Sequence, residues 1–300
     1  MALVACILAG TAWDKTAAQP LRLGIGPTKI GKSLAEDMQR RGKTIEMGRV
    51  TEALDGQFTS AFVGIGKFTV IARTDLQTLL DREQGLPAGA VVDPETAAKS
   101  GKIKGLQNMV VISVDSFLDE QTKMSSPALG VESIKRRLQL SCVANIYDCS
   151  TGEISASPNF QSELVDTTDV LQSESGNKGD RLDELMVKVA RLAAEKAAHR
   201  VTDVLYPAKI MDVEGATLTI NRGESLGIKT EQMWDLYGPS KEVRDPDTGK
   251  VKKIKGKKIG SVRIKSVDAD SAQGELVGPA ASPVAVGCVL TLPTEASPKQ

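Results

Sequence analysis

The feature that most constrains the fold is the change of pattern at Pro207. In residues 181–206, apolar side chains recur every three or four positions, which predicts one long helix that packs on a sheet. The members of this stripe are Leu182, Leu185, Met186, Val189, Ala193, Ala197, Val201 and Val204. Proline ends a helix because it has no amide hydrogen to donate. We therefore divide the chain here, since 300 residues are enough for two domains with separate cores.

After Pro207 the sequence consists of short β-prone segments separated by turn residues. They recur at steps of about eight to twelve residues, which is typical of a small barrel or sandwich. We predict a small all-β, barrel-like domain over residues 207–293, followed by a polar tail over residues 294–300.

Residues 20–206 mix strand and helix patterns, and they predict an α/β (α+β) domain in which helices flank a mixed sheet. The expected strands are residues 21–25, 67–72, 108–117 and 137–148, and the last alternates apolar and polar residues as a strand with one covered face does. The expected helices are residues 51–63, a segment capped by Thr74 and a segment that opens at Asp93 and Pro94. Residues 34–49 show no clear pattern, and residues 166–179 are expected to form a polar loop.

Composition argues against several classes of function. The chain has 38 basic and 38 acidic side chains, so no overall charge attracts nucleic acid. None of the four cysteines, Cys6, Cys142, Cys149 and Cys288, forms a C-x-x-C pair, and we expect Cys142 and Cys149 to be small core or turn residues. The single histidine, His199, lies off the helical stripe, so a surface position is expected and no catalytic triad can be assembled. We therefore expect no catalytic residue, no metal site, no cofactor and no enzymatic activity.

The first 19 residues resemble an export signal. Their apolar run is too short to span a bilayer but suits the hydrophobic part of a signal peptide, and the alternative is a buried first strand. The letters LVAC are similar to a bacterial lipobox, which would make Cys6 the lipidated residue. The expectation is an exported protein of the periplasm or the periplasmic face of the outer membrane, associated with the membrane through its N-terminus.

One motif favours a different function. GPTKIGKS fits the phosphate-loop pattern G-x-x-x-x-G-K-[ST], and Gly26, Gly31, Lys32, Ser33 and Asp115 would then form a nucleotide site. In that alternative, Lys32 would hold the phosphates, Ser33 the magnesium and Asp115 a water on the metal. The flanking segments fit poorly, because the strand before the loop contains an arginine and the helix after it is short and polar. We keep nucleotide binding as an alternative only.

A second cluster is basic and lies in the predicted β-domain. Its lysines are Lys250, Lys252, Lys253, Lys255, Lys257 and Lys258. A solvated hairpin is one interpretation; an edge that faces lipid headgroups, acidic glycan or a partner protein is the other.

Three segments resemble the CsgG/LpoB-like family in the right order. In GKFTVIARTDLQTLLDREQG, a strand leads into a helix as in that family. The matching positions are Lys67, Phe68, Val70, Ile71, Arg73, Leu76, Leu79, Leu80, Glu83 and Gln84. The following segment, DPETAAKSGKIKGLQNMVVISVDSF, is similar to the next helix, turn and strand. VANIYDCSTGEISAS is similar to the family's hairpin, with Asp148, Thr151, Gly152 and Glu153 at the matching positions.

The C-terminal part is similar to the last domain of the flagellar assembly protein FlgT. Together these resemblances imply a non-enzymatic adaptor or assembly and secretion factor of the bacterial envelope, with envelope proteins as partners. They leave a homo-oligomer open and imply no nucleic-acid partner.

The same resemblance raises a second alternative, a subunit of an oligomeric outer-membrane secretion channel. The curli channel carries two long amphipathic hairpins, and a membrane strand needs about nine to eleven alternating residues. We expect no strands of this kind between Ser116 and Gly179, which disfavours the channel.

Overall fold

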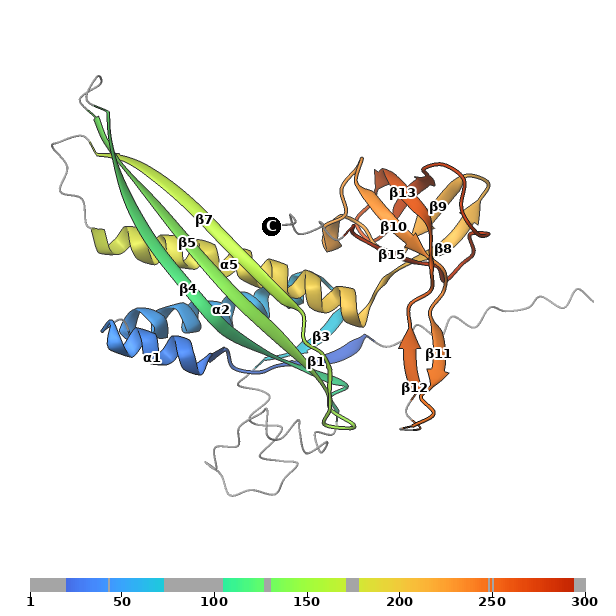
Figure 1. Cartoon of the computed structure of the whole chain (residues 1–300), viewed down its shortest axis with the longest axis horizontal. Coiled ribbons are helices and arrows are strands. Elements are labelled where there is room, and N and C mark those ends of the chain that lie inside the picture. Colours follow the sequence, from blue (N-terminus) through green and yellow to red (C-terminus); the bar gives the residue numbers. More distant parts are fainter. Residues whose placement is uncertain are drawn as a thin grey trace, which may run out of the picture.

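The computed structural model describes residues 20–42, 44–72, 105–126, 131–170, 178–247, 249 and 251–293. They form an N-terminal domain of one mixed sheet with helices and a C-terminal barrel, as predicted (Figure 1). The predicted leader with Cys6, the segments after Thr74 and Asp93, and the polar tail lie outside the described residues.

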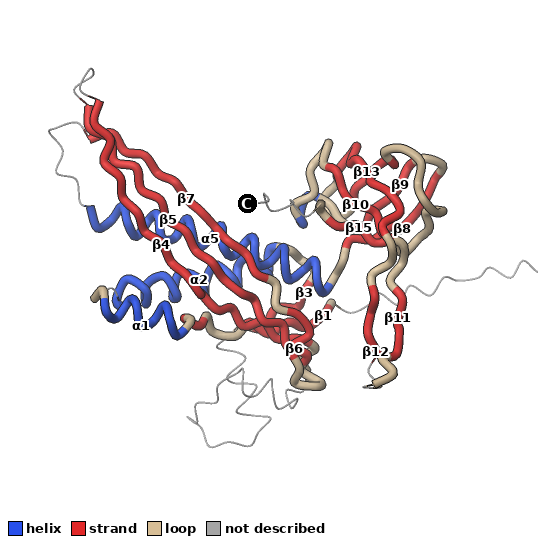
Figure 2. Tube along the Cα trace, viewed as in Figure 1, coloured by secondary structure: helices blue, strands red, loops and turns tan. Residues whose placement is uncertain are grey.

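The N-terminal sheet has seven strands. Its elements are β1 (Leu21–Ile25), β2 (Lys29–Ile30), β3 (Phe68–Ile71), β4 (Asn108–Ser126), β5 (Val131–Asp148), β6 (Ile154–Ala156) and β7 (Asn159–Val170). The order is β3-β1-β4-β5-β6, with β2 beside β4 and β7 beside β5. β1 runs parallel to β3 and β4, whereas β5 lies between β4 and β7 and runs antiparallel to both. Figure 2 shows the three long strands side by side, extending past the rest of the sheet.

Among the described residues, three helices pack on this sheet: α1 (Lys32–Arg40), α2 (Thr44–Gly64) and α5 (Lys178–Leu205). The predicted stripe of α5 is buried from Leu185 to Val201, and its end at Val204 is exposed. The strand pattern of β5 is confirmed, since Leu138, Leu140, Cys142, Ala144 and Ile146 are all buried in one core with the helices. Most of α1 and the first six residues of α2 fall in the segment without a clear pattern, residues 34–49.

Two strand predictions are wrong. β4 continues nine residues beyond the expected end at Phe117, and β7 includes residues 166–170, which were expected to be a loop. Both extra segments are polar, so their strand character comes from pairing with β5 and not from an apolar alternation.

The C-terminal barrel closes with six strands. In sequence they are β8 (Ala208–Glu214), β9 (Thr217–Ile220), β10 (Met233–Tyr237), β13 (Lys258–Val267), β14 (Ala272–Leu276) and β15 (Val289–Thr291). The closed order is β10-β13-β14-β9-β8-β15, around a core of its own that includes Trp234, Leu236 and Val262. A short helical turn, η1 (Glu224–Leu226), follows β9. A separate two-stranded ribbon, β11 (Lys241–Arg244) and β12 (Val251–Ile254), leaves the barrel between β10 and β13.

Candidate functional site

The phosphate-loop motif forms an irregular strand beside β4. The amide of Gly26 donates to the carbonyl of Val110 at 2.8 Å, and the amide of Gly31 donates to the carbonyl of Val114 at 2.8 Å. Between them β2 pairs in parallel with Ser113 and Val114. These amides complete the sheet, whereas a phosphate cradle needs them turned toward the ligand.

The middle of the loop contacts a carboxylate. The amide of Thr28 donates to Oδ1 of Asp55 on α2 at 2.8 Å, so a negative charge already occupies this part of the loop. Lys32 and Ser33 are exposed in the first turn of α1, and Asp115 lies beside Gly31, where an added Cβ would be 3.4 Å from Asp115 Oδ1. Gly31 thus lies beside Asp115 and directly precedes Lys32 and Ser33, whereas Gly26 pairs with Val110, four residues before Val114 along β4, and the backbone is arranged as a sheet edge.

The outer part of β4, β5 and β7 is a polar three-stranded sheet held by ion pairs. Arg136 on β5 binds Asp119 on β4 through two hydrogen bonds of 2.8 and 2.6 Å. Arg137, the next residue, points to the other face and binds Glu163 on β7 at 2.9 and 3.2 Å. The hydrogen bond and the charge of Glu163 raise the pKa of Arg137. Cross-strand pairs of this kind explain why such a polar segment stays extended.

The length of these strands corrects one expectation. β4 has 19 residues and β5 has 18, so long strands do continue past Ser116, although residues 118–126 lack the apolar alternation expected of a membrane strand. Among the described residues, β4 beyond Ser116 pairs only with β5, and β7 pairs only with β5. Within the described ranges the outer sheet therefore has two edges that pair with no further strand, and the backbone groups of such an edge can accept one.

The two domains are joined by a buried arginine. Arg222, only 3% exposed, follows β9 and reaches the C-terminal end of α5. Its guanidinium forms an ion pair with Asp203 and donates to the carbonyl of Tyr206 at 2.5 Å. A cation is favoured here because the last carbonyls of a helix are unpaired and partly negative. A second ion pair, 3.3 Å long, joins Lys67 of the N-terminal domain to Asp270 of the barrel.

His199 belongs to this joint and is not a surface residue as expected. It is half-buried, its Nδ1 is buried without a hydrogen-bond partner, and its ring packs on Gly227 after η1. Gly227 has φ +78, so a side chain there would be both strained and within 3.2 Å of the ring. Burial lowers the pKa of His199, Arg222 lowers it further, and the carboxylates of Asp203 and Glu195 oppose the shift. Its role is therefore structural, at the contact between α5 and the barrel.

The basic cluster is distributed over the ribbon and its base. Lys250 lies outside the described residues, and Lys252 and Lys253 are on β12. Lys257 is exposed, whereas Lys255 and Lys258 contact the barrel. Lys258 binds Asp235 at 2.7 Å, and this hydrogen bond raises the pKa of Lys258.

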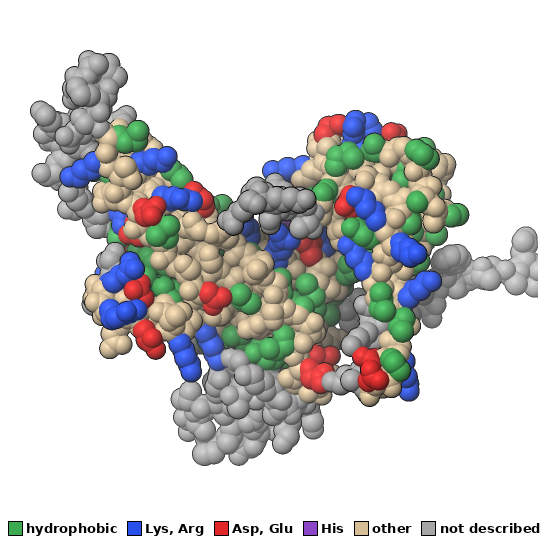
Figure 3. Space-filling model, in the orientation of Figure 1, with side chains coloured by type: hydrophobic (Ala, Val, Ile, Leu, Met, Phe, Trp, Pro, Cys, Tyr) green, Lys and Arg blue, Asp and Glu red, His purple; other side chains and the backbone are tan. Residues whose placement is uncertain are grey.

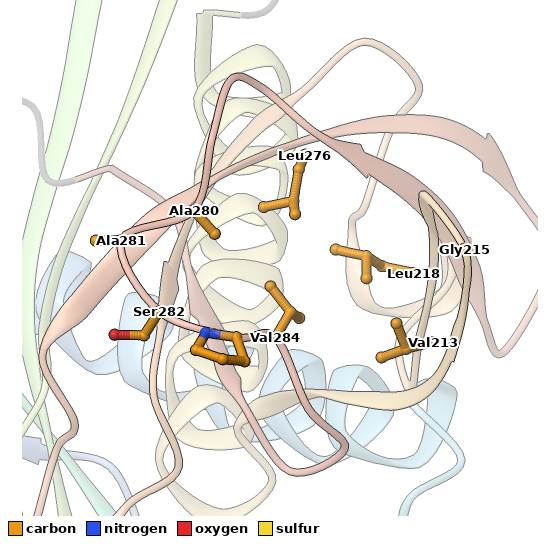
Figure 4. A pocket seen from close by; sticks show the side chains of 9 residues that line it. Val213, Gly215, Leu218, Leu276, Ala280, Ala281, Ser282 and Val284 are labelled. Atoms are coloured by element: carbon orange, nitrogen blue, oxygen red, sulfur yellow. The ribbon is translucent and has the colours of Figure 1, made fainter.

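The described part of the chain contains no cluster of three or more His, Cys, Asp or Glu side chains that could hold a metal ion. Cys142 and Cys149 are buried free thiols, as predicted, and burial raises the pKa of each to about 12, so both are unreactive. An open cavity of about 500 Å³ on the barrel is lined by Val213, Leu218, Leu276, Val284 and neighbouring residues, of which none is ionisable (Figure 4).

Within the described residues, no helix is both long and apolar enough to cross a bilayer.

Three bacterial proteins of known structure match part of the chain. A minor lipoprotein from Acinetobacter baumannii is 8% identical, with a TM-score of 0.32 over 61% of this chain and 91% of that one. A putative neuraminyllactose-binding hemagglutinin homolog from Helicobacter pylori is 15% identical, with a TM-score of 0.31 over 61% and 83%. A lipoprotein from Neisseria meningitidis is 14% identical, with a TM-score of 0.24 over 58% and 99%. No curated protein sequence matches the chain.

The sequence itself matches a family model. The model of the curli production assembly/transport component CsgG covers residues 38–231, which is more than half of the chain. The match begins after the phosphate-loop motif, so that motif is not part of it. It includes the three helices in whole or part, the long strands, and Arg222 at the joint. The chain therefore belongs to the CsgG family.

Proposed function

We propose that this protein is a non-enzymatic accessory factor of the bacterial cell envelope that acts as an adaptor or assembly factor through protein contacts. Membership of a family of assembly and transport components supports this function. The observation that carries it is the outer sheet of β4, β5 and β7, which has two free edges and ion pairs on both faces. The sheet extends beyond the hydrophobic core, so core packing does not require it. An exposed sheet edge can bind a partner protein by pairing with one of the partner's strands.

The chemistry of the described residues supports a binding role over catalysis. The amides of the phosphate-loop motif are used within the sheet or by Asp55, the barrel cavity has no ionisable lining, and the buried thiols have raised pKa values. Export of the chain to the periplasm or to the periplasmic face of the outer membrane, with Cys6 as a lipid anchor, is part of the same proposal.

Site-specific photo-crosslinking in intact cells tests this function. A photoreactive residue at Thr122 on β4 or Thr167 on β7, both exposed, should crosslink the same envelope protein, while one at exposed Glu36 on α1 should not. An Arg136→Ala exchange breaks the pair with Asp119 and should reduce the crosslinks from Thr122. Equal crosslinking from all three sites, or a cytoplasmic location of the chain, would contradict the proposal.

A secretion-channel subunit is the second candidate, because β4 and β5 are longer than the nine to eleven or so residues of a membrane strand. The adaptor remains the better proposal, because charged residues occupy both faces of the outer sheet, including Arg136 on one face and Arg137 on the other. Sedimentation of the detergent-extracted protein, followed by conductance in planar bilayers, separates the two. A ring that conducts ions would favour the channel; a non-conducting species would favour the adaptor.

A further inference from the structure

The ribbon of β11 and β12 lies outside both hydrophobic cores. None of its described side chains, those of β11 and Ile254, belongs to either core, and in the described part of the chain its two strands pair only with each other. It projects from the barrel as a separate arm (Figure 1). An isolated two-stranded hairpin is marginally stable in water. An element of this kind is expected to gain contacts elsewhere.

The base of the ribbon is fixed to the barrel. The amide of Gly238 donates to the carbonyl of Lys257 at 2.9 Å, and a Cβ on Gly256 would lie 2.3 Å from the oxygen of Gly238. Only glycine allows the two strands to cross this closely. Lys255 places its ammonium 3.4 Å from the centre of the Tyr237 ring and donates to Thr291 Oγ1 at 3.2 Å. The barrel therefore holds the ribbon in a defined direction.

The ribbon and its base are strongly basic in a chain whose net charge is zero. Residues 241–258 contain eight basic side chains and three acidic ones. The basic residues are Lys241, Arg244, Lys250, Lys252, Lys253, Lys255, Lys257 and Lys258, and the acidic residues are Glu242, Asp245 and Asp247. Lys241, Arg244 and Lys257 are exposed, and the described part of the chain gives none of them an ion pair. Their charge is therefore available to a ligand.

Exposed aliphatic residues accompany this charge. Val243 is 45% exposed and Ile254 is 52% exposed. In the register of the ribbon, Lys241 is opposite Ile254 and Val243 is opposite Lys252. Because residues two apart on a strand share a face, these four positions form one face that alternates basic and aliphatic residues.

We propose that this face binds an anionic lipid surface. Seven of the eight basic residues are lysine, which acts as a point charge toward a layer of phosphates, and only one is arginine, whose fork suits bidentate recognition. Protein interfaces are enriched in arginine and aromatic residues and depleted in lysine, and residues 241–258 contain no aromatic residue. The composition thus favours lipid headgroups over a protein partner, and the aliphatic side chains enter the boundary below the headgroups.

The acidic residues determine how the ribbon lies on the membrane. Asp245 and Asp247 follow directly after β11, at the far end of the ribbon, where Figure 3 shows acidic side chains gathered at the tip. A tip-first approach would bring these carboxylates toward the lipid phosphates. The strands therefore lie along the surface, with the lysine-bearing face toward the headgroups. This inference goes beyond the proposed adaptor role and does not require it.

Flotation of the full chain with vesicles tests the proposal. The vesicles contain phosphatidylcholine and phosphatidylglycerol in a two-to-one ratio, and pure phosphatidylcholine vesicles measure binding that needs no charge. The test variant is Lys241→Gln and Lys252→Gln, which lie at positions of the proposed face, together with Lys257→Gln at the base of the ribbon. The matched control is Lys123→Gln, Lys135→Gln and Arg191→Gln, three exposed basic residues of the N-terminal domain. Because the ribbon lies outside both cores, each triple variant should retain the melting temperature of the parent protein.

A basic residue near an anionic membrane changes the partition coefficient by about fivefold, so the ribbon variant should bind the anionic vesicles on the order of a hundredfold more weakly. The control should bind like the parent, and added salt should weaken the parent toward the ribbon variant. A second variant, Val243→Ser with Ile254→Ser, should lower binding at high salt without changing its salt dependence.

Three results would overturn the proposal. The parent protein could fail to bind the anionic vesicles above the level of pure phosphatidylcholine. The two triple variants could lose binding equally, which would show an effect of total charge. Soluble polyglutamate could bind the ribbon as tightly as the vesicles do and displace them completely, which would assign the ribbon to an acidic protein.

Discussion

Removal of the Arg222 guanidinium should uncouple the barrel from the N-terminal domain. The side chain is 3% exposed and donates to the carbonyl of Tyr206 at 2.5 Å and, more weakly, to that of Thr202 at 3.5 Å. In Arg222→Ala these helix-terminal carbonyls lose a charged donor, at about 1.5–3 kcal/mol for the shorter bond. Asp203 is 41% exposed and regains water, so its pair adds less than about 1 kcal/mol. We expect a total loss of about 3 kcal/mol.

Urea denaturation with two probes measures this loss. Trp234 is buried in the barrel core, so its fluorescence follows the barrel, and Trp13→Phe removes the other tryptophan. Far-UV circular dichroism follows the helices, because α1, α2 and α5 all belong to the N-terminal domain. The two signals should change together in the parent protein. In Arg222→Ala the Trp234 transition should move to lower urea than the helix transition.

Matched variants test whether the destabilisation comes from losing the contact of Arg222 with the end of α5 or merely from removing a positive charge. Arg263→Ala removes a barrel arginine that is 46% exposed and 4.0 Å from Glu231, and it should cost less than about 0.5 kcal/mol. Asp203→Asn should cost about 0.5–1 kcal/mol. Coincident transitions at an unchanged midpoint in Arg222→Ala would refute the role of this residue. An equally large loss in Asp203→Asn would show that the ion pair, and not the contact with the helix carbonyls, holds the joint.

Three further predictions concern the motif, the histidine and the ribbon. Calorimetry should detect no ATP binding to the parent protein or to Lys32→Ala; micromolar binding that the exchange abolishes would restore the nucleotide alternative. Because the pKa of His199 is lowered in the folded protein, the unfolded chain takes up a proton first as the pH falls below about 6.5. The free energy of unfolding should therefore fall with acidification, and it should fall more in the parent protein than in His199→Gln. Equal slopes of unfolding free energy against pH in both proteins would contradict this. Gly256→Ala should destabilise the barrel by about 2 kcal/mol, measured by the fluorescence of Trp234. The control is Gly48→Ala in α2, where the added Cβ meets nothing within 4 Å, and it should raise helix stability by up to about 1 kcal/mol. The reverse order of the two effects would refute the close crossing at the ribbon base.

The sequence predicts those parts of the fold that depend on local periodicity. The apolar stripe of α5 and the apolar–polar alternation of β5 can both be recognised in the sequence, because each element buries one continuous face. Residues 44–50, the first third of α2, are not predicted as helix, although Met47 and Val50 are 2% and 0% exposed, because few apolar residues mark these first turns. The division at Pro207 is visible for the same local reason, since proline and short β-prone segments need no tertiary information.

The joint between the domains could not be predicted, because it depends on contacts between distant positions. Arg222 occurs in a turn-like segment, and nothing near it in sequence indicates that it reaches Asp203 and Tyr206. His199 lies off the apolar stripe, and it is buried only because Gly227 packs against it from the barrel. A helical pattern shows which face meets the domain's own core, but it does not show which further residues a second domain will cover.

The strands of the outer sheet are equally hard to predict from local sequence patterns. Apolar alternation detects a strand that buries one face, and residues 118–126 have none because they extend beyond the core. What holds them is the register, which places Arg136 beside Asp119 and Arg137 beside Glu163 on opposite faces. Because both faces of this sheet carry charges, burial of apolar side chains contributes little to its stability. In the described part of the chain its two edges also pair with no further strand, so the sheet remains exposed at the surface. Since those edges are where we place the partner, the segment that sequence patterns identify least well is also the one on which the proposed function depends.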